Sequence, residues 1–357
     1  MTTNLGTYDI SSLLAARSTT AKQIGVEAVT AALRADLAAH NAIVREIVED
    51  LCEVSVDALR VWGGGNVADM FEVDEYGTAP GQKHLPGYNV GFPLSLFQFT
   101  VNFTRKFLES APVSEIAQAQ IDAEIAHKRM IEKKIRLAIF NDGNYNFRDI
   151  NVDNVSLPVK RLLNADGEEI PNGEAGQTFT AATHTHYLST GTAALADFTG
   201  LLDHVVEHGH GNGMKLFINK SNQSAYETLW STSFHALQPS YIINANYAAT
   251  AGIPNTPLDV TKSDNRMIGY LEAAEVWVKS WMPANYAFAF ASKDPRKPLV
   301  LRQRKAETLQ GLRLAAEFDQ YPLLAKYYEA ELGIGVWERS NGAVLYTGND
   351  TWADVTS

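Results

Sequence analysis

Residues 97–140 read FQFTVNFTRKFLESAPVSEIAQAQIDAEIAHKRMIEKKIRLAIF, and this stretch carries most of the information about the fold. Its first eight residues alternate apolar and polar side chains, which is the period-2 pattern of a half-buried strand. Pro112 then precedes a helical pattern over residues 113–140, which at 1.5 Å per residue would span ~40 Å. Acidic residues come early in that pattern and basic residues late, as the helix dipole favours. The stretch predicts a strand that leads into one long helix.

The segment before this strand predicts a projecting loop. Residues 67–75 have the composition of a strand, and residues 76–95 form a long connection rich in Gly and Pro. Because a compact domain rarely contains so long a connection without a function, we expect residues 63–105 to form an extended β-loop. A disordered surface loop is the alternative. Ahead of it, residues 20–54 are Ala-rich with helical spacing, so residues 1–62 are expected to form a mostly helical N-terminal arm that includes Cys52.

Beyond the long helix (106–144) the pattern changes twice. Residues 145–190 are polar and rich in turns, with an Asp166–Gly167 hairpin signal, and predict a β-rich excursion or inserted subdomain. Residues 191–296 alternate helices and strands, as expected of an α/β domain. Residues 297–357 predict a return to the first domain, closed by a β-hairpin with Asn341–Gly342 at its turn. The fold class is α+β.

Composition excludes several classes of protein. The chain has 357 residues, of which 45% are hydrophobic, and a net charge of −11, which does not favour duplex DNA binding. The basic half of the long helix, residues 128–136, is either a solvated face or a face turned toward a polyanion. One cysteine allows no intrachain disulfide and no cysteine-based zinc site. No signal peptide and no membrane-spanning run is visible.

The pattern His204-Val-Val-Glu207-His208 matches the spacing of an inverted zinc-peptidase motif. On a helical wheel both histidines fall on the polar face, opposite the apolar residues, so we expect them to face solvent. His184 and His186 could supply further imidazoles, but their segment has the character of a surface strand or loop. A zinc metallopeptidase is therefore the disfavoured alternative. We expect no catalytic residue, no cofactor and no metal.

The order of these elements resembles that of the major capsid proteins of tailed bacteriophages, which have the Hong Kong 97 fold and share it with encapsulins. FTRKFLES followed by PVSEIAQAQID (residues 103–122) resembles the family's passage from extended loop to spine helix. Residues 267–283 resemble its axial-domain strand, and residues 328–345 its last peripheral-domain hairpin. The resemblance implies an N-terminal arm, an extended β-loop, a spine helix, a peripheral β-domain and an α/β axial domain.

This resemblance implies a shell subunit that forms homo-hexamers and pentamers around phage double-stranded DNA, with an encapsulin-type compartment as the alternative. Portal, scaffolding and decoration proteins would be its partners, and DNA would be contacted non-specifically at most. The protein would be made in the host bacterial cytoplasm and reside in the virion capsid, without membrane contact. Some relatives crosslink a loop lysine to a neighbour's asparagine, which would here involve Lys83 and Asn341. The residues expected to take part in assembly are Lys83, His84, Tyr88, Phe92, Arg105, Lys106 and Asn341.

Overall fold

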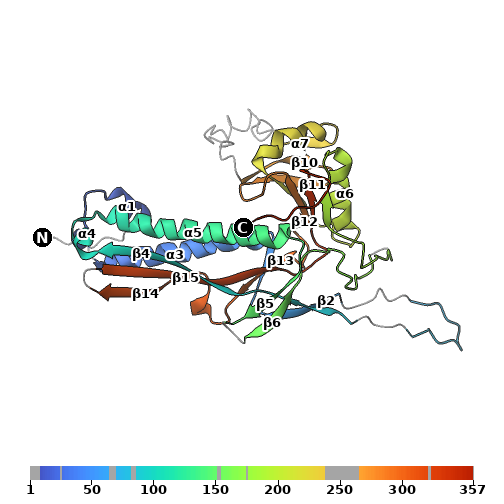
Figure 1. The fold of residues 1–357 in the computed structure, drawn as a ribbon, viewed down its shortest axis with the longest axis horizontal. Helices are drawn as coiled ribbons and strands as arrows, with labels where there is room; N and C mark the ends of the chain where they lie inside the picture. The colour runs from blue at the N-terminus through green and yellow to red at the C-terminus, as the bar shows by residue number, and fades with distance from the viewer. Residues whose placement is uncertain are drawn as a thin grey trace, which may run out of the picture.

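A computed structural model describes most of the chain. The described residues are 9–24, 26–63, 70–81, 86–150, 154–173, 176–237, 265–320 and 323–356. In the ribbon, a long and narrow half built around one helix continues into a broader half with a second sheet, and a loop projects from the broad end (Figure 1).

The narrow half is a helix pair lying on a twisted sheet. Helix α5 (Val113–Phe140) runs its whole length, with α3 (Val26–Glu49) beside it. Its five-stranded sheet follows the order β1-β13-β15-β14, and β4 pairs along β15 (Figure 1). The strands are β1 (Cys52–Ser55), β4 (Ser95–Thr104), β13 (Leu299–Gln303), β14 (Leu312–Gln320) and β15 (Leu323–Val336). Short helices α1 (Ile10–Ala15), α2 (Ala21–Ile24) and α4 (Arg105–Ser110) lie at the far end.

The broad half is a seven-stranded mixed sheet in the order β7-β16-β12-β8-β11-β10-β9. Helices α6 (Leu195–Val206) and α7 (Gln223–Leu229) cover one of its faces (Figure 1). The strands are β7 (Tyr187–Ser189), β8 (Met214–Ile218), β9 (Phe234–Ala236), β10 (Asn265–Leu271), β11 (Ala274–Lys279), β12 (Tyr286–Ala291) and β16 (Ala343–Tyr346).

Strand β12 explains how this sheet is buried on both faces. Its sequence YAFAFA alternates aromatic residues with alanine, and successive strand side chains point to opposite faces. Phe288 and Phe290 pack into the core that contains the end of α5, whereas Ala287 and Ala289 face the core under α6. The small alanine side chains let α6 approach the sheet closely.

Two small ladders complete the fold. Strands β2 (Leu59–Trp62) and β3 (Tyr88–Gly91) form an antiparallel pair at the base of the projecting loop. Strands β5 (Tyr145–Asp149) and β6 (Val155–Val159) form a hairpin. Two 3₁₀ turns lie at Lys220–Asn222 and Glu307–Leu309.

The sequence-based expectations for α5 and β4 are confirmed, but four others are wrong. The closing hairpin does not form, because β15 belongs to the five-stranded sheet and β16 to the seven-stranded one. Residues 70–75 contain no strand, and the loop ladder is β2–β3. Residues 20–54 are not helical throughout, since Cys52 begins β1. Asp166–Gly167 forms a turn in which Gly167 has φ +79, but no strands flank it as a hairpin.

Two expectations about how the chain is divided into parts also differ from the structure. Helix α3 packs along α5, so this part of the N-terminal segment does not extend ahead of the body as an arm. The seven-stranded sheet takes β7 and β16 from outside residues 191–296, so the expected axial domain is not one continuous segment. Both differences arise from long-range pairing, which local patterns do not encode.

A polar cluster joins α3 to α5. The Gln120 side-chain nitrogen donates to the Leu33 carbonyl oxygen and to the Asp36 carboxylate, both at 2.8 Å. Burial, and then the hydrogen-bonded Asp36 carboxyl, raise the pKa of Glu124 to about 8. One helical turn on, His127 lies 3.0 Å from His40, and burial lowers the pKa of His127 to about 4.

The raised pKa of Glu124 predicts a pH-dependent stability. Because the folded pKa lies above the ordinary 4.5, the contribution of Glu124 to folding is complete below about pH 4.5 and is lost as the pH rises through about 8. Glu124→Gln keeps a neutral group at every pH. Relative to wild type, we expect the variant to gain about 1–2 kcal/mol, or about 1–3 °C in unfolding midpoint, between pH 6 and pH 9.

The measurement is thermal unfolding of both proteins at pH 6 and pH 9, at equal protein concentration. Glu115→Gln, an exposed position on the same helix, is the control and should show no such change between the two pH values. Equal midpoint differences for Glu124→Gln at both pH values would show that this carboxyl ionises without cost.

Candidate assembly surfaces

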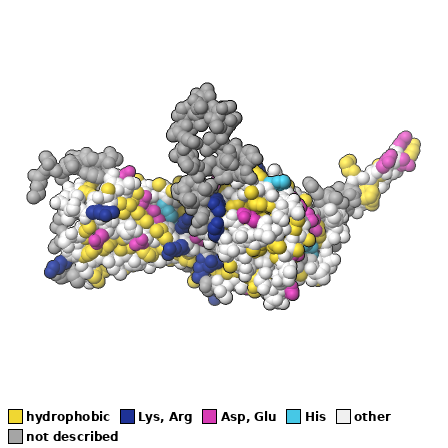
Figure 2. Space-filling view, turned by 90° about the horizontal axis from the view of Figure 1, so that it is seen from above, with side chains coloured by type: hydrophobic (Ala, Val, Ile, Leu, Met, Phe, Trp, Pro, Cys, Tyr) yellow, Lys and Arg dark blue, Asp and Glu magenta, His cyan; other side chains and the backbone are white. Residues whose placement is uncertain are grey.

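The projecting loop is the least buried part of the described chain. Residues 70–77 are all exposed, and they combine apolar with acidic side chains. Met70 is fully exposed (100%) and Tyr76 is 90% exposed. A group of large apolar side chains that is so exposed commonly marks a surface that binds another molecule. Figure 2 shows the described tip reaching away from the body, with hydrophobic and acidic side chains at its end.

The base of the loop, in contrast, is anchored in the core. Trp62 and Val90 pack with Phe92, Leu163 and Val300 in one hydrophobic cluster. The Trp62 indole nitrogen donates to the Glu338 carboxylate at 2.7 Å. The loop therefore leaves the body from a rigid base.

Arg339 is the centre of that base and is completely buried. Its guanidinium donates to the Tyr88 hydroxyl and lies 5.8 Å from the Trp62 ring and 5.5 Å from the Tyr88 ring. Its other donors reach the Arg161 carbonyl oxygen at 2.7 Å, the Leu162 carbonyl oxygen at 3.3 Å, the Asn164 side-chain oxygen at 2.8 Å and the Asp166 carboxylate at 3.1 Å. Burial raises the pKa of Tyr88, so its hydroxyl stays protonated. One side chain thus joins the loop ladder to residues 161–166 and to the connection between the two sheets.

A second buried ion pair supports the same region. Arg302 on β13 and Asp149 on β5 lie 2.7 Å apart, and each side chain is 3% exposed. Arg302 also donates to the Phe92 carbonyl oxygen at 2.8 Å. Breaking a buried pair of this kind by removing one partner typically costs 3–5 kcal/mol.

The residues expected to take part in assembly lie in different environments: some are buried, one is exposed and others lie outside the described residues. Tyr88 and Phe92 belong to the loop base and pack inside their own chain. Lys106 is exposed on α4, while the side chain of Arg105 lies outside the described residues, as do Lys83 and His84. Asn341 is 0% exposed, and its side chain bonds to Ala291 and Arg296 of the same chain. The expectation that Asn341 faces a neighbour is wrong for this structure, because the turn after β15 is inserted between the two sheets.

The narrow half carries further exposed apolar and basic side chains. Leu96, Phe318 and Leu323 are about half exposed on β4, β14 and β15. Lys128, Arg129 and Lys133 are exposed on the basic half of α5. These side chains are available to contact other molecules.

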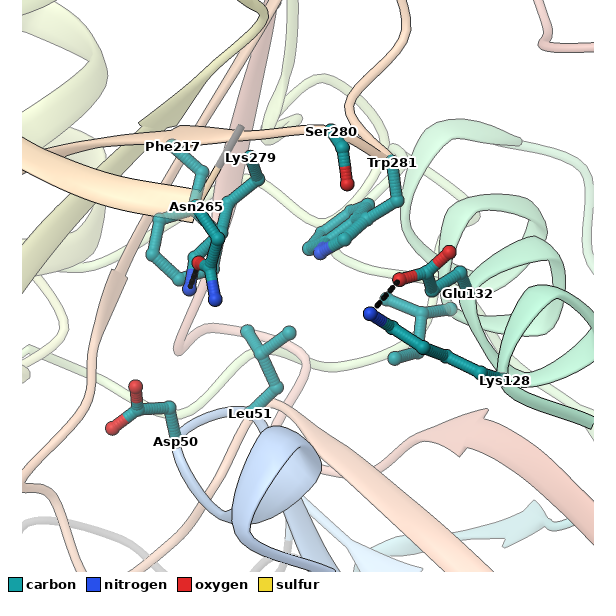
Figure 3. A pocket seen from close by; sticks show the side chains of 10 residues that line it. Asp50, Leu51, Lys128, Glu132, Phe217, Asn265, Lys279, Ser280 and Trp281 are labelled. Atoms are coloured by element: carbon teal, nitrogen blue, oxygen red, sulfur yellow. Dashed lines mark hydrogen bonds and ion pairs between the residues drawn. The ribbon is translucent and has the colours of Figure 1, made fainter. Parts of the chain in front are cut away.

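A small pocket lies where the two halves meet (Figure 3). Its volume is about 50 Å³, which is room for one or two waters and too little for an organic cofactor. Lys128 and Glu132 of α5 form an ion pair on one side, and Lys279 lies 2.7 Å from Asn265 on the other (Figure 3). Burial lowers the pKa of Lys279 to about 8. The pocket thus lies between the halves, with charged and polar side chains in its lining.

The histidines of the inverted motif are not where the sequence placed them. His204, Glu207 and His208 meet His184 and His186, which come from the segment before β7. His186 is completely buried, and the side chain of His208 is 3% exposed. Burial lowers the pKa of His184, His186 and His208, that of His208 to about 3. The expectation of a solvent-facing surface is wrong, because a helical wheel shows which residues share a face but not what covers it.

Two signals in the sequence could have indicated these positions. His184 and His186 are two residues apart, so an extended segment places them on the same side. Gly209 has φ +84, and a glycine in this left-handed conformation commonly ends a helix, here beside His208. No pattern in the sequence indicated that Arg339 and Trp62 would be buried at the base of the loop.

Comparison with known proteins establishes the fold. No family model and no curated protein matches the sequence. Among solved structures, a chain of Mycobacterium phage Patience is 20% identical, with a TM-score of 0.66 over 99% of this chain and 96% of that chain. The holo-SrpI encapsulin complex from Synechococcus elongatus PCC 7942 is 11% identical, with a TM-score of 0.47 over 88% and 90% of the two chains. A virus-like particle from Pyrococcus furiosus is 13% identical, with a TM-score of 0.42 over 88% and 97%.

The chain has the Hong Kong 97 fold that its sequence predicted. This conclusion rests on the likeness over nearly the whole chain to the phage structure. The structure also contains a projecting loop, a long spine helix (α5), a five-stranded sheet that corresponds to the expected peripheral domain and a seven-stranded sheet, called the axial sheet below. Within the described part of the chain, no helix combines the length and apolar character needed to cross a bilayer.

The Arg339 network predicts a large effect of one substitution. Arg339→Met fills similar space but leaves the oxygens around it buried without their donor, so we expect a loss of about 3–5 kcal/mol in unfolding free energy. Chemical denaturation of the full chain measures this loss. Arg129→Met, at an exposed position on α5, is the control and should stay within about 0.5 kcal/mol of wild type. A loss below about 1 kcal/mol for Arg339→Met would mean that the network does not hold the loop base.

Proposed function

We propose that this protein is the major capsid subunit of a tailed phage, which self-assembles into hexamers and pentamers of an icosahedral shell around double-stranded DNA. The observation that carries the proposal is the loop, which is rigidly anchored at Arg339 yet exposes Met70, Phe71, Val73 and Tyr76 at its described tip. Such side chains lower their free energy only by packing against another molecule.

The elongated outline supports a second copy of the chain as that molecule. A long narrow half and a projecting loop give a monomer little compactness but offer much area to neighbours (Figure 1). Obligate interfaces between subunits bury thousands of Å² in total. The acidic side chains Glu72, Asp74 and Glu75 at the tip would be attracted by a basic surface on the neighbour, such as the exposed lysines and arginine of α5.

A non-enzymatic role accords with this arrangement. The pocket between the halves is small, and the exposed apolar side chains of the loop tip and sheet edges are the features that this proposal uses. A capsid is preferred to an encapsulin-type compartment because the likeness with a TM-score of 0.66 is to a phage chain. Portal, scaffolding and decoration proteins are expected partners in the same setting, and DNA would be contacted through non-specific charge at most.

Assembly of the purified full-length chain tests the proposal. Electron microscopy is expected to show closed shells, or hexamers and pentamers, and particles from phage-producing cells are expected to protect DNA from nuclease. Protein cargo in place of DNA would favour the compartment. A chain that stays monomeric in every condition, including co-expression with its neighbouring genes, would overturn the proposal.

The loop tip gives a sharper test. Met70→Ser with Tyr76→Ser should abolish shells or reduce their yield at least tenfold, while the unfolding midpoint of the unassembled chain stays within about 1 °C, because neither side chain packs in its own core. Met70→Leu with Tyr76→Phe is the matched control, which keeps apolar size and should assemble. Normal shells from the double serine variant would show that the tip is not an assembly contact.

A further inference from the structure

Four side chains from two distant segments converge beside the axial sheet. His184 and His186 come from the chain entering β7, and His204 and Glu207 come from the end of α6. One ligand atom from each lies within 4.8 Å of the other three. Neither the capsid role nor the loop requires this convergence.

The spacing of the donor atoms fits a tetrahedral metal ion. The Nε2 atom of His184 lies 3.2 Å from Nε2 of His186 and 3.5 Å from Oε1 of Glu207, and Nδ1 of His204 lies 2.8 Å from that oxygen. Four ligands at the usual zinc distances of 2.0–2.2 Å lie ~3.3 Å from one another along the tetrahedron's edges. The donors therefore need only small movements to surround one ion.

His186 is held in the form that a metal requires. Its Nδ1 lies 2.7 Å from the Gly342 carbonyl oxygen, which can only accept, so Nδ1 carries the proton. The lone pair of the neutral ring is then on Nε2, the atom that faces the cluster. Its backbone is fixed as well, since the amide donates to the Leu163 carbonyl oxygen and the carbonyl accepts from Val344. A ligating histidine held by a backbone carbonyl is the usual arrangement around protein-bound zinc.

Hydrogen bonds alone satisfy the cluster poorly. Nε2 of His184 is 3.2 Å from Nε2 of His186 and also 3.0 Å from Nε2 of His208. A neutral imidazole has at most one hydrogen on that atom, so it cannot donate to both neighbours. An ion between His184 and His186 would accept the Nε2 lone pair of each ring at once.

We propose that His184, His186, His204 and Glu207 bind one zinc-type divalent transition-metal ion, which has a structural role. Imidazole with one carboxylate suits zinc and its first-row neighbours, not Mg²⁺ or Ca²⁺. Four protein ligands complete a tetrahedron and leave no position for a substrate, which separates this site from a peptidase centre. His208 lines the site, and the Phe179 ring lies 4.1 Å from the His208 ring and 4.7 Å from that of His184 and covers them.

The ion would tie the segment before β7 to α6. Glu207 and His204 are about one-third exposed, so an ion can enter from their side. Because the folded chain binds the ion and an unfolded chain does not hold this geometry, loading raises stability by mass action. At a free zinc concentration of about 100 times Kd we expect the unfolding midpoint to rise by about 5 °C.

Metal analysis of the untagged full-length protein tests the proposal directly. After removal of ions with a chelator and reloading with Zn²⁺, elemental analysis should find one zinc per chain, and Mg²⁺ loading should leave none. Co²⁺ in its place should show the intense visible absorption of a four-coordinate ion. His204→Gln and Glu207→Gln should each weaken zinc binding at least tenfold.

The control is His235→Gln, because His235 is exposed on β9 and lies outside the cluster. It should bind zinc as wild type does, and circular dichroism should show all variants folded. Less than one-tenth of an ion per folded wild-type chain would overturn the proposal, as would unchanged zinc binding in both cluster variants. Since the readout is metal content, the result is independent of whether the chain forms shells.

Discussion

Arg339 is the side chain on which the arrangement of the loop depends. A guanidinium removed from water costs several kcal/mol unless its donors find acceptors inside the protein, and Arg339 finds them in Tyr88, in residues 161–166 and on the faces of two aromatic rings. Each of these groups belongs to a different part of the chain. The ladder β2–β3 at the base of the loop is therefore held to the body through this one buried side chain.

A shared hydrophobic core joins the two halves of the molecule. Helix α5 contributes Ile135, Ile139 and Phe140 to a core that also receives Phe217 and Phe288 from the axial sheet. Helix α5 thus packs in both halves, and the pocket of Figure 3 lies beside it where the halves meet. Packed side chains resist compression, so this shared core couples the two halves mechanically.

Periodicity in the sequence was enough to predict α5 and β4, because each turns one side toward the core over many residues and so repeats its pattern. Three features could not be predicted in this way. The Asn341–Gly342 turn has the local chemistry of a hairpin, yet its flanking strands pair with different sheets. Met70 lies in residues 67–75, whose composition predicted a strand, yet residues 70–75 are exposed and form no strand in the structure. The wheel of α6 placed His204 and His208 together correctly, but whether that face meets water depends on residues 179–186, which lie in a separate segment.

Strand β16 has a consequence for the order of events during synthesis. It lies between β7 and β12, so the axial sheet has a gap until residues 343–346 have left the ribosome. Synthesis is slow compared with local folding, and a nascent chain therefore waits with its sheet incomplete. Strands β13 and β15 precede β16 in the chain, so the strands of the five-stranded sheet are all synthesised before the seven-stranded sheet can be completed.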